Sequence, residues 1–159
     1  NTAKELLSLS TKDVLYDLYC GYGLFSLSCA ANVKNVVGIE LSRTSINDAV
    51  DNARRNKLNN VRFHAADISA ESLPKFFMLE HRNLKFLIDP PRNGTAEDVI
   101  KFLVEQQPQK VAHIFCNSDI IEKELSKWKK FGYHPTKAQP FDMFPGTVDV
   151  EMMVLLEKQ

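Results

Sequence analysis

The chain has 159 residues, 44% of them hydrophobic, a length and composition that suit one compact domain with a full core. Its 20 basic and 20 acidic residues balance, so composition alone gives no electrostatic case for a nucleic-acid partner. Three cysteines without a CxxC pair argue against a disulfide framework or a zinc cluster, and no apolar run reaches the roughly 18 residues of a membrane span. We therefore expect a monomer in a reducing, intracellular compartment (cytoplasmic, nuclear or organellar), with no metal and no membrane partner.

Along the chain, short β-rich runs alternate with helical patterns. The sequence opens in a helical pattern over residues 2–9 with no signal peptide before it, which predicts a piece of a longer protein. The predicted strands are residues 13–18, 35–40, 61–65, 84–89, 110–116, 133–140 and 148–157. The predicted helices are residues 24–31, 42–57, 69–79, 95–106 and 118–131, with Ser42 and Ser118 as N-caps and Gly132 as a C-cap glycine.

This order predicts an α/β fold with a doubly wound, mostly parallel sheet of seven strands. Strands joined by crossover helices build a parallel sheet covered on both faces. No helix separates the last two strands, so we expect them to pair antiparallel at one edge, with the last strand antiparallel. The arrangement resembles class I methyltransferases, which are Rossmann-like.

A glycine-rich turn follows the first predicted strand. In the segment DLYCGYG, Gly21 and Gly23 permit tight turning and close approach of a ligand, but the third glycine of the dinucleotide fingerprint is missing. Glu40 ends the next strand 19 residues after Gly21, where an acid can hold two ribose hydroxyls, and Asp67 follows the third strand near a possible adenine site. An ordinary turn with solvated acids is the alternative. The acids in register favour a nucleoside cofactor.

Other residues of this region remain open. Tyr19 either packs against the cofactor or points into the sheet. Cys20 and Cys29 are expected to be small buried fillers rather than reactive thiols.

The fourth predicted strand ends in Asp89-Pro-Pro-Arg92, at the edge where open α/β folds bind ligands. The prolines present Asp89 and Arg92 with little freedom. A plain strand stop is the alternative interpretation. Methyltransferases that act on planar nitrogens use a similar D/N-P-P-Y/F loop, so an N-methyltransferase stays in the comparison, although Arg92 replaces the stacking aromatic.

Cys116 ends the fifth predicted strand, directly before a helix whose positive N-terminus would lower the pKa of the thiol. Asn117 adds an amide able to bind a pyrimidine edge. Glu151 lies in an otherwise apolar strand, where a carboxylate needs a partner or a task. A buried filler cysteine and an exposed edge-strand glutamate are the alternatives.

Taken together, these residues resemble the RNA uracil-5-methyltransferase family, the enzymes that make 5-methyluridine in tRNA and rRNA. The matching segments are DLYCGYG, VVGIELSRTSINDAVDNARRN, DPPRNG, FCN and PFDMFPGTVDVE. The chain departs from the family's usual pattern at Phe115 and Ser118 around the Cys-Asn pair, at Gly146, and at Asp149, where the family usually has a histidine.

The resemblance implies that Cys116 is the nucleophile and Glu151 the general base. It also implies that Tyr19, Gly21, Glu40 and Asp89 line the site, with S-adenosylmethionine as cofactor and an RNA uridine as substrate, in tRNA as the first expectation. Residues 1–159 would then be the catalytic domain of a longer protein whose β-barrel domain lies upstream. An N- or O-methyltransferase of the same fold and a catalytically silent nucleotide- or RNA-binding domain are the alternatives.

Overall fold

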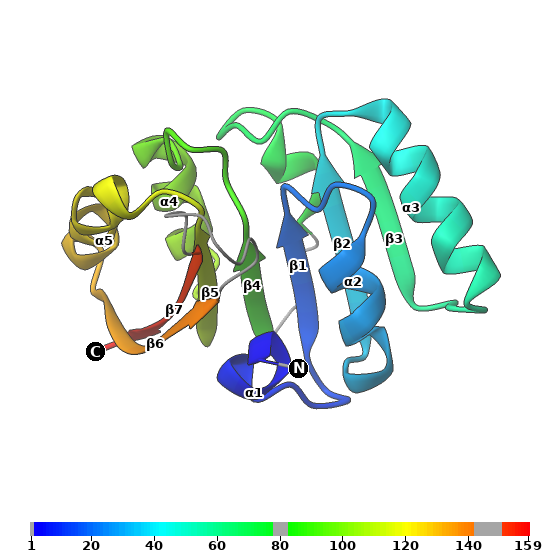
Figure 1. Ribbon diagram of the computed structural model, residues 1–159, viewed down its shortest axis with the longest axis horizontal. Helices are drawn as coiled ribbons and strands as arrows, with labels where there is room; N and C mark the ends of the chain where they lie inside the picture. The colour runs from blue at the N-terminus through cyan, green and yellow to red at the C-terminus, as the bar shows by residue number, and fades with distance from the viewer. Residues whose placement is uncertain (1, 78–82, 142–150) are drawn as a thin grey trace.

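The computed structural model describes residues 2–77, 83–141 and 151–159 and confirms the predicted fold class. In this part of the chain, seven strands form one sheet in the order β3-β2-β1-β4-β5-β7-β6 (Figure 1). The pairs β1–β2, β2–β3, β1–β4 and β4–β5 are parallel, and β7 is antiparallel to both of its neighbours. The strands are β1 (Val14–Leu18), β2 (Asn35–Glu40), β3 (Val61–Ala65), β4 (Leu84–Ile88), β5 (Lys110–Phe115), β6 (Tyr133–Phe141) and β7 (Glu151–Lys158).

Helices cover both faces of the sheet. The helices are α1 (Thr2–Leu7), α2 (Leu24–Cys29), α3 (Arg43–Arg55), α4 (Glu97–Glu105) and α5 (Ile121–Lys130), with short 3₁₀ turns η1 (Ala30–Asn32), η2 (Leu73–Phe76) and η3 (Ser118–Ile120). One core layer joins α1 and α2 to the sheet, and a second, larger layer joins α4 and α5 to the opposite face. Among the described residues, no helix has the length and apolar character needed to cross a bilayer.

The central strands explain why the sheet forms. Every residue of β1 and of β4 is buried, as expected for strands covered on both faces. The one charged side chain of β4, Lys85, is buried and donates to Asp13 at 2.7 Å, so its charge is paired. The outer strand β6 contains Pro135 and Pro140 and is largely exposed, as is typical of an edge strand.

Most predicted helix boundaries are confirmed, and two are corrected. The hydroxyl of Ser42 accepts the Ser45 N–H at 3.2 Å, and Gly132 has φ +81° just after α5, so both caps are confirmed. Ser118 is not an N-cap: Asn117 caps η3 instead, and α5 begins only at Ile121. The predicted helix over residues 69–79 is reduced to η2, because its described part closes in a single 3₁₀ turn that begins with Leu73-Pro74. The end of that predicted helix, from residue 78, lies outside the described residues.

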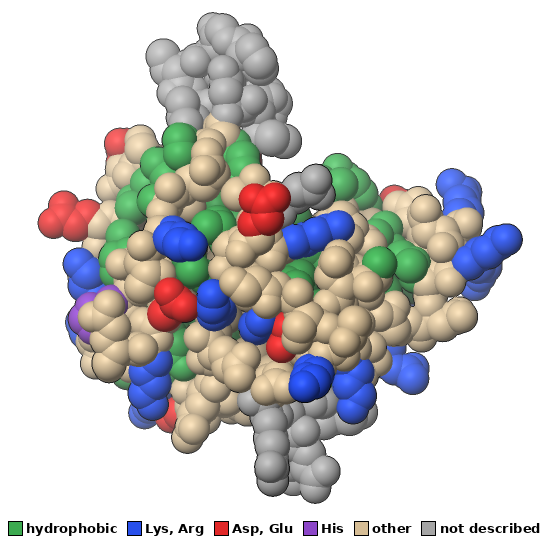
Figure 2. All heavy atoms as spheres, turned by 90° about the horizontal axis from the view of Figure 1, so that it is seen from below, with side chains coloured by type: hydrophobic (Ala, Val, Ile, Leu, Met, Phe, Trp, Pro, Cys, Tyr) green, Lys and Arg blue, Asp and Glu red, His purple; other side chains and the backbone are tan. Residues whose placement is uncertain are grey.

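The face at the amino ends of the parallel strands has a mixed charge. Figure 2 shows basic and acidic side chains interspersed there with apolar ones. This face therefore adds no concentrated positive field, in keeping with the balanced composition. The candidate site lies at the opposite edge of the sheet.

Candidate active site

The carboxyl ends of the parallel strands and the amino end of β7 meet at one edge of the sheet (Figure 1). The turn between β1 and α2 lies there, at the carboxyl end of β1. Its tight backbone places Tyr19, Gly21 and Gly23 at positive φ angles of 62°, 53° and 87°. The Gly23 N–H donates to the Cys20 carbonyl at 2.9 Å and closes the turn. This tight backbone confirms the predicted turn and carries the chain from β1 directly into α2.

The two glycines of the turn are required for different reasons. A Cβ at Gly23 would lie 2.9 Å from Cζ of Phe63, so packing excludes a side chain there. A Cβ at Gly21 would meet no atom of the described residues within 4 Å, so its positive φ and the open space beside it leave room for a ligand. Gly21 therefore fits a cofactor-facing position, and Gly23 a packing position.

Glu40 is fixed at the end of β2 by the same turn. One carboxylate oxygen accepts the Gly21 N–H at 3.3 Å, and the other accepts the Ser42 N–H at 2.8 Å. Two backbone donors thus orient the carboxylate while leaving acceptor capacity on both oxygens. This arrangement suits a group that must hold a diol such as a ribose.

A cleft of about 640 Å³ opens beside Glu40. Three of the residues predicted for the cofactor site, Tyr19, Asp67 and Asp89, line it as well, which places Tyr19 in the cleft wall. Burial raises the pKa of Tyr19 to about 12, with the Asp67 carboxylate as the second cause. The Tyr19 hydroxyl is therefore a neutral donor at physiological pH.

Sequence reasoning missed several residues of the same cleft. Leu41 is 68% exposed directly after Glu40, and Ile68 follows Asp67, so each acid has an apolar neighbour suited to a planar ring. The cleft is also lined by Thr95, in the loop before α4, and by Lys127 of α5. Leu41 could have been suspected from the sequence, because it directly follows an acid at the end of a predicted strand. Nothing in the sequence pointed to Lys127, because it comes from a distant helix.

Asp17, the first residue of the glycine-rich segment, is completely buried. Its Oδ2 accepts both the Ser26 N–H at 2.9 Å and the Ser26 hydroxyl at 2.6 Å, while its Oδ1 has no hydrogen-bond partner among the described residues. Burial raises the pKa of Asp17 to about 7. The residue holds the start of α2 against β1 and titrates near neutrality.

The register of β5 and β7 brings the predicted nucleophile and base together. Phe115 of β5 pairs with Met152 of β7, so Cys116 and Glu151 occupy the next opposed positions. Asp89, just past β4, lies on the other side of β5's end, and its amide donates to the Leu18 carbonyl at 3.2 Å. Burial and the Glu151 charge raise the pKa of Asp89 to about 6. Three candidate groups from three strands therefore form one cluster.

The expected thiolate at Cys116 is corrected. Burial, followed by the Asp89 charge, raises the pKa of the Cys116 thiol above its ordinary value, and Arg92 only partly offsets this. Cys116 is followed by the 3₁₀ turn η3, and α5 starts only at Ile121, so the thiol does not directly precede the first turn of that helix as predicted. Cys20 and Cys29 are buried, as predicted, whereas Cys116 is partly exposed.

The remaining predicted substrate groups flank this cluster. Arg92 lies exposed in the turn that the Gly94 N–H closes onto the Pro91 carbonyl at 2.8 Å. The side-chain oxygen of Asn117 accepts the Asp119 N–H at 3.0 Å and is therefore engaged in capping η3. Gly146 and Asp149, the two departures from the family pattern near Glu151, lie outside the described residues.

Glu151 also lines a second, mostly apolar hollow of about 310 Å³. Its walls come from α1, α2, β5, β6 and β7 and include Leu24, Phe25, Phe141 and Met153. A carboxylate at the rim of an apolar hollow can act on a planar, weakly polar group placed there.

Comparison with known proteins identifies the family of the chain. Residues 2–159 match the sequence family described as tRNA (Uracil-5-)-methyltransferase. RNA methyltransferases of Streptococcus agalactiae and Streptococcus pyogenes are 33% and 35% identical over 98% and 99% of the chain. The chain spans 34% of the length of each of these relatives.

A solved structure shares the fold. The tRNA (uracil-54, C5)-methyltransferase of Pyrococcus abyssi, in complex with S-adenosyl-L-homocysteine, superposes with a TM-score of 0.79 at 23% identity. The superposition covers 98% of this chain and 37% of that one. With a family match over nearly every residue and a class I methyltransferase sheet, the chain belongs to the tRNA (uracil-5-)-methyltransferase family.

Proposed function

We propose that this protein methylates C5 of a uridine in RNA, with tRNA as the first substrate to test and residues 1–159 as the catalytic domain. The observation that carries the proposal is the strand register that sets Cys116 opposite Glu151, with Asp89 beside them. A thiol, a carboxylate and a second carboxyl group at one sheet edge provide a nucleophile, a base and a hydrogen-bonding group for a pyrimidine.

The cleft beside the β1–α2 turn fits S-adenosylmethionine, the cofactor that family membership implies. Glu40 would hold the ribose hydroxyls, and Asp67 would face the adenine. The open space at Gly21 would let the cofactor come close to the protein backbone. Leu41 and Ile68 offer apolar surface for the adenine ring. When bound, the cofactor supplies an electrophilic methyl group.

The protein's residues make uracil reactive toward that methyl group. Uracil C5 is a poor nucleophile, and addition of the Cys116 thiolate to C6 gives C5 enolate character. A bond then forms from C5 to the methyl carbon as the carbon–sulfur bond of the donor breaks. Glu151 takes the C5 proton, the C5–C6 double bond re-forms, and the C6–S bond breaks to release the thiolate.

Because the pKa of Cys116 is raised, groups around the thiol must help it to lose its proton. The thiol must lose its proton when the substrate is in place, and the carboxylate charges of Asp89 and Glu151 act on it. Arg92 favours the thiolate by its charge. Because the thiol is mainly protonated in the free protein, we infer that activation accompanies RNA binding.

The target base must leave its stack to reach the cluster, because C6 is inaccessible in paired and stacked RNA. The apolar hollow beside Glu151 offers a place for a planar group. Two polar groups lie close to the thiol: Asp89 follows the neighbouring strand β4, and Asn117 is the next residue in the chain. A uridine in a loop is therefore the expected substrate.

The test is the intact mass of the protein after incubation with S-adenosylmethionine and RNA that carries 5-fluorouridine. Fluorine at C5 blocks the deprotonation that would release the thiol, so the covalent complex should accumulate. Cys116→Ala should form none, while Cys29→Ala, at a buried position in α2 that the proposed chemistry does not use, should behave like the unmutated protein. Methylation of RNA without any adduct would instead favour a nitrogen or oxygen target and overturn the proposal.

A further inference from the structure

A buried ion pair lies on α5, outside the cluster described above. Glu124 is only 1% exposed, and its Oε1 is paired with the Lys127 ammonium one turn further along the helix. Its Oε2 accepts the Thr95 N–H at 2.8 Å. Both oxygens of a fully buried carboxylate are therefore committed to fixed partners.

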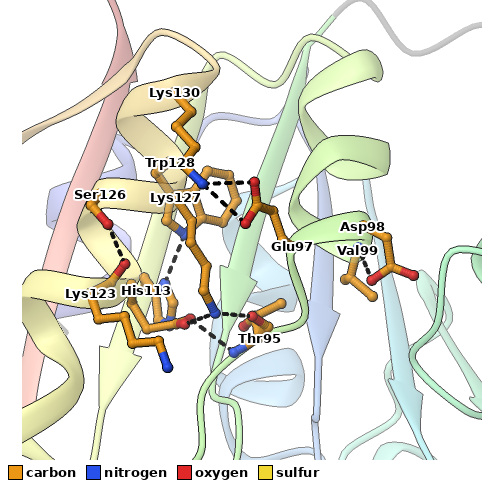
Figure 3. Close-up of polar contacts among 11 residues, drawn as sticks. Thr95, Glu97, Asp98, Val99, His113, Lys123, Ser126, Lys127, Trp128 and Lys130 are labelled. Carbon is orange, nitrogen blue, oxygen red and sulfur yellow. Dashed lines mark hydrogen bonds and ion pairs between the residues drawn. The ribbon is translucent and has the colours of Figure 1, made fainter.

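Lys127 completes the contact with the same loop. Its ammonium donates to the Thr95 carbonyl at 2.7 Å, and Figure 3 shows the side chain reaching from α5 toward Thr95 in the loop before α4. Thr95 is thus held at both its N–H and its C=O by one ion pair. Lys127 and Thr95 also line the cofactor cleft, so the contact lies in the wall of that cleft.

The loop is shaped to receive this carboxylate. Gly94 has φ +80°, and a Cβ there would lie 2.5 Å from Cδ of Glu124. The Gly94 N–H donates to the Pro91 carbonyl at 2.8 Å, which closes a turn in the loop. The glycine therefore permits both the turn and the close approach of Glu124.

The pair connects two segments of the proposed catalytic edge. Glu124 belongs to the helix that follows Cys116, and Thr95 belongs to the loop that follows Asp89 and Arg92. Replacing buried ion pairs by apolar residues often leaves stability unchanged or improves it, so such a pair is weak evidence for stability. A role in fixing geometry accounts for its position better than a role in holding the fold.

We propose that Glu124 and Lys127 form a positioning pair that holds the 90–96 loop against α5 and so sets the wall of the cofactor cleft and the placement of Asp89 relative to Cys116. The proposal rests on the proposed function for its catalytic consequence. The structural part of the proposal, that the pair holds the loop, depends only on the hydrogen bonds of Thr95.

The chain offers a matched control. Lys130 and Glu97 also join α5 to α4, at 2.9 Å, but their side chains are 57% and 50% exposed and neither is among the described residues that line the cleft (Figure 3). Breaking that pair removes an α4–α5 ion pair without touching the loop.

The experiment compares the double variants Glu124→Gln/Lys127→Met and Glu97→Gln/Lys130→Met. The first removes both charges of the pair together, so no unpaired charge is left behind and the melting temperature should stay near that of the unmutated protein. In this variant the glutamine offers the Thr95 N–H only a neutral acceptor, and the methionine cannot donate to the Thr95 carbonyl. Its affinity for S-adenosylhomocysteine, measured by calorimetry, should therefore fall about tenfold, and exchange of the Thr95 amide hydrogen should accelerate about tenfold, as for one lost hydrogen bond to a charged group. The control double variant should change neither quantity.

The outcomes separate the two proposals. Unchanged Thr95 exchange and unchanged affinity in the Glu124→Gln/Lys127→Met protein would overturn the positioning role. If the unmutated protein itself fails to bind S-adenosylhomocysteine, the cofactor assignment falls, and Thr95 exchange still decides whether the pair fixes the loop. Should the double variant not fold, the single variant Glu124→Gln serves in its place: it keeps the shape and a neutral acceptor for the Thr95 N–H, so both readouts should move in the same direction by less than tenfold, and no change in either would overturn the positioning role.

Discussion

At the ends of β1 and β2, the groups proposed to hold the cofactor are fixed by hydrogen bonds within adjacent turns. At the ends of β4, β5 and β7, the groups proposed for catalysis meet only because the strands are in register. Glu40 is oriented by the amides of Gly21 and Ser42. Cys116 faces Glu151 because Phe115 pairs with Met152.

In the catalytic region, burial and like charges act on the groups proposed to react. Asp89 and Cys116 have raised pKa values because burial, followed by the charge of a neighbouring carboxylate, disfavours their ionised forms. The cofactor region is thus organised before a ligand arrives, whereas the catalytic region holds protons that must move during the reaction. We therefore expect substitutions in the catalytic region to change the chemical step steeply, and substitutions in the cofactor region to weaken binding by the hydrogen bonds that they remove.

The largest effect is expected at Cys116. Cys116→Ala removes the thiol placed to add to C6, so methylation should fall by about 10³-fold or more. Cofactor affinity should be unchanged, because Cys116 is not among the described residues that line the cofactor cleft. Single-turnover methylation together with calorimetry checks both statements, and a variant that retains methylation would end the covalent mechanism.

Glu151→Gln should stall the reaction after the thiol has added. Glutamine keeps the shape and hydrogen-bonding capacity of glutamate but cannot accept the proton, so turnover should fall about 10²–10⁴-fold while a covalent RNA–protein complex accumulates. A denaturing gel with labelled RNA measures the complex.

Normal turnover without trapped complex would assign the base elsewhere. Asp149, two residues away, would be the first residue to test. If the two carboxylates share the task, the pH–rate profile would report the pair rather than Glu151 alone.

Glu40→Ala should weaken cofactor binding without changing the chemistry of bound substrate. Two charge-assisted hydrogen bonds to the ribose, each worth about 1.5–3 kcal/mol, would be lost, which corresponds to at least a tenfold fall in affinity per bond. Glu40→Gln, which keeps acceptor capacity for one of the two backbone amides, should lose less. Unchanged affinity for S-adenosylhomocysteine in Glu40→Ala would contradict the assignment.

The smallest expected effect is a pH dependence of stability. The pKa of Asp17 rises from the ordinary 3.8 to about 7 on folding, so between these values the folded state keeps a proton that the unfolded chain has lost. The contribution of Asp17 to the free energy of unfolding is therefore fully present below about pH 4 and is lost as the pH rises toward 7. The upper limit of this loss is about 4 kcal/mol. Asp89, with its pKa raised to about 6, contributes in the same direction.

Melting temperatures between pH 5 and pH 8 test this dependence. Asp17→Asn should flatten the decline with pH, while Asp51→Asn, on the exposed surface of α3, should leave it intact. A decline of equal slope in Asp17→Asn would show that other groups carry the proton.

Local patterns in the sequence determined much of this protein. The alternation of strands and helices predicted the sheet and its antiparallel end, and the spacing of Gly21, Gly23 and Glu40 predicted the turn and its acid. These features depend on residues close together in the chain, whose backbone preferences follow from their own identities. The identity of the candidate nucleophile and base came from motifs rather than from physical constraint.

The tertiary structure decided what depends on distant residues. The expected thiolate at Cys116 was wrong because the pKa of the thiol is raised by burial and then by the Asp89 charge, and neither cause is local in the sequence. Leu41 and Lys127 were missed because a cleft exists only after several elements are packed together. Glu124 and Thr95 lie 29 residues apart, and only the packing of α5 against the loop before α4 turns an ordinary helical glutamate into a buried partner of the catalytic edge.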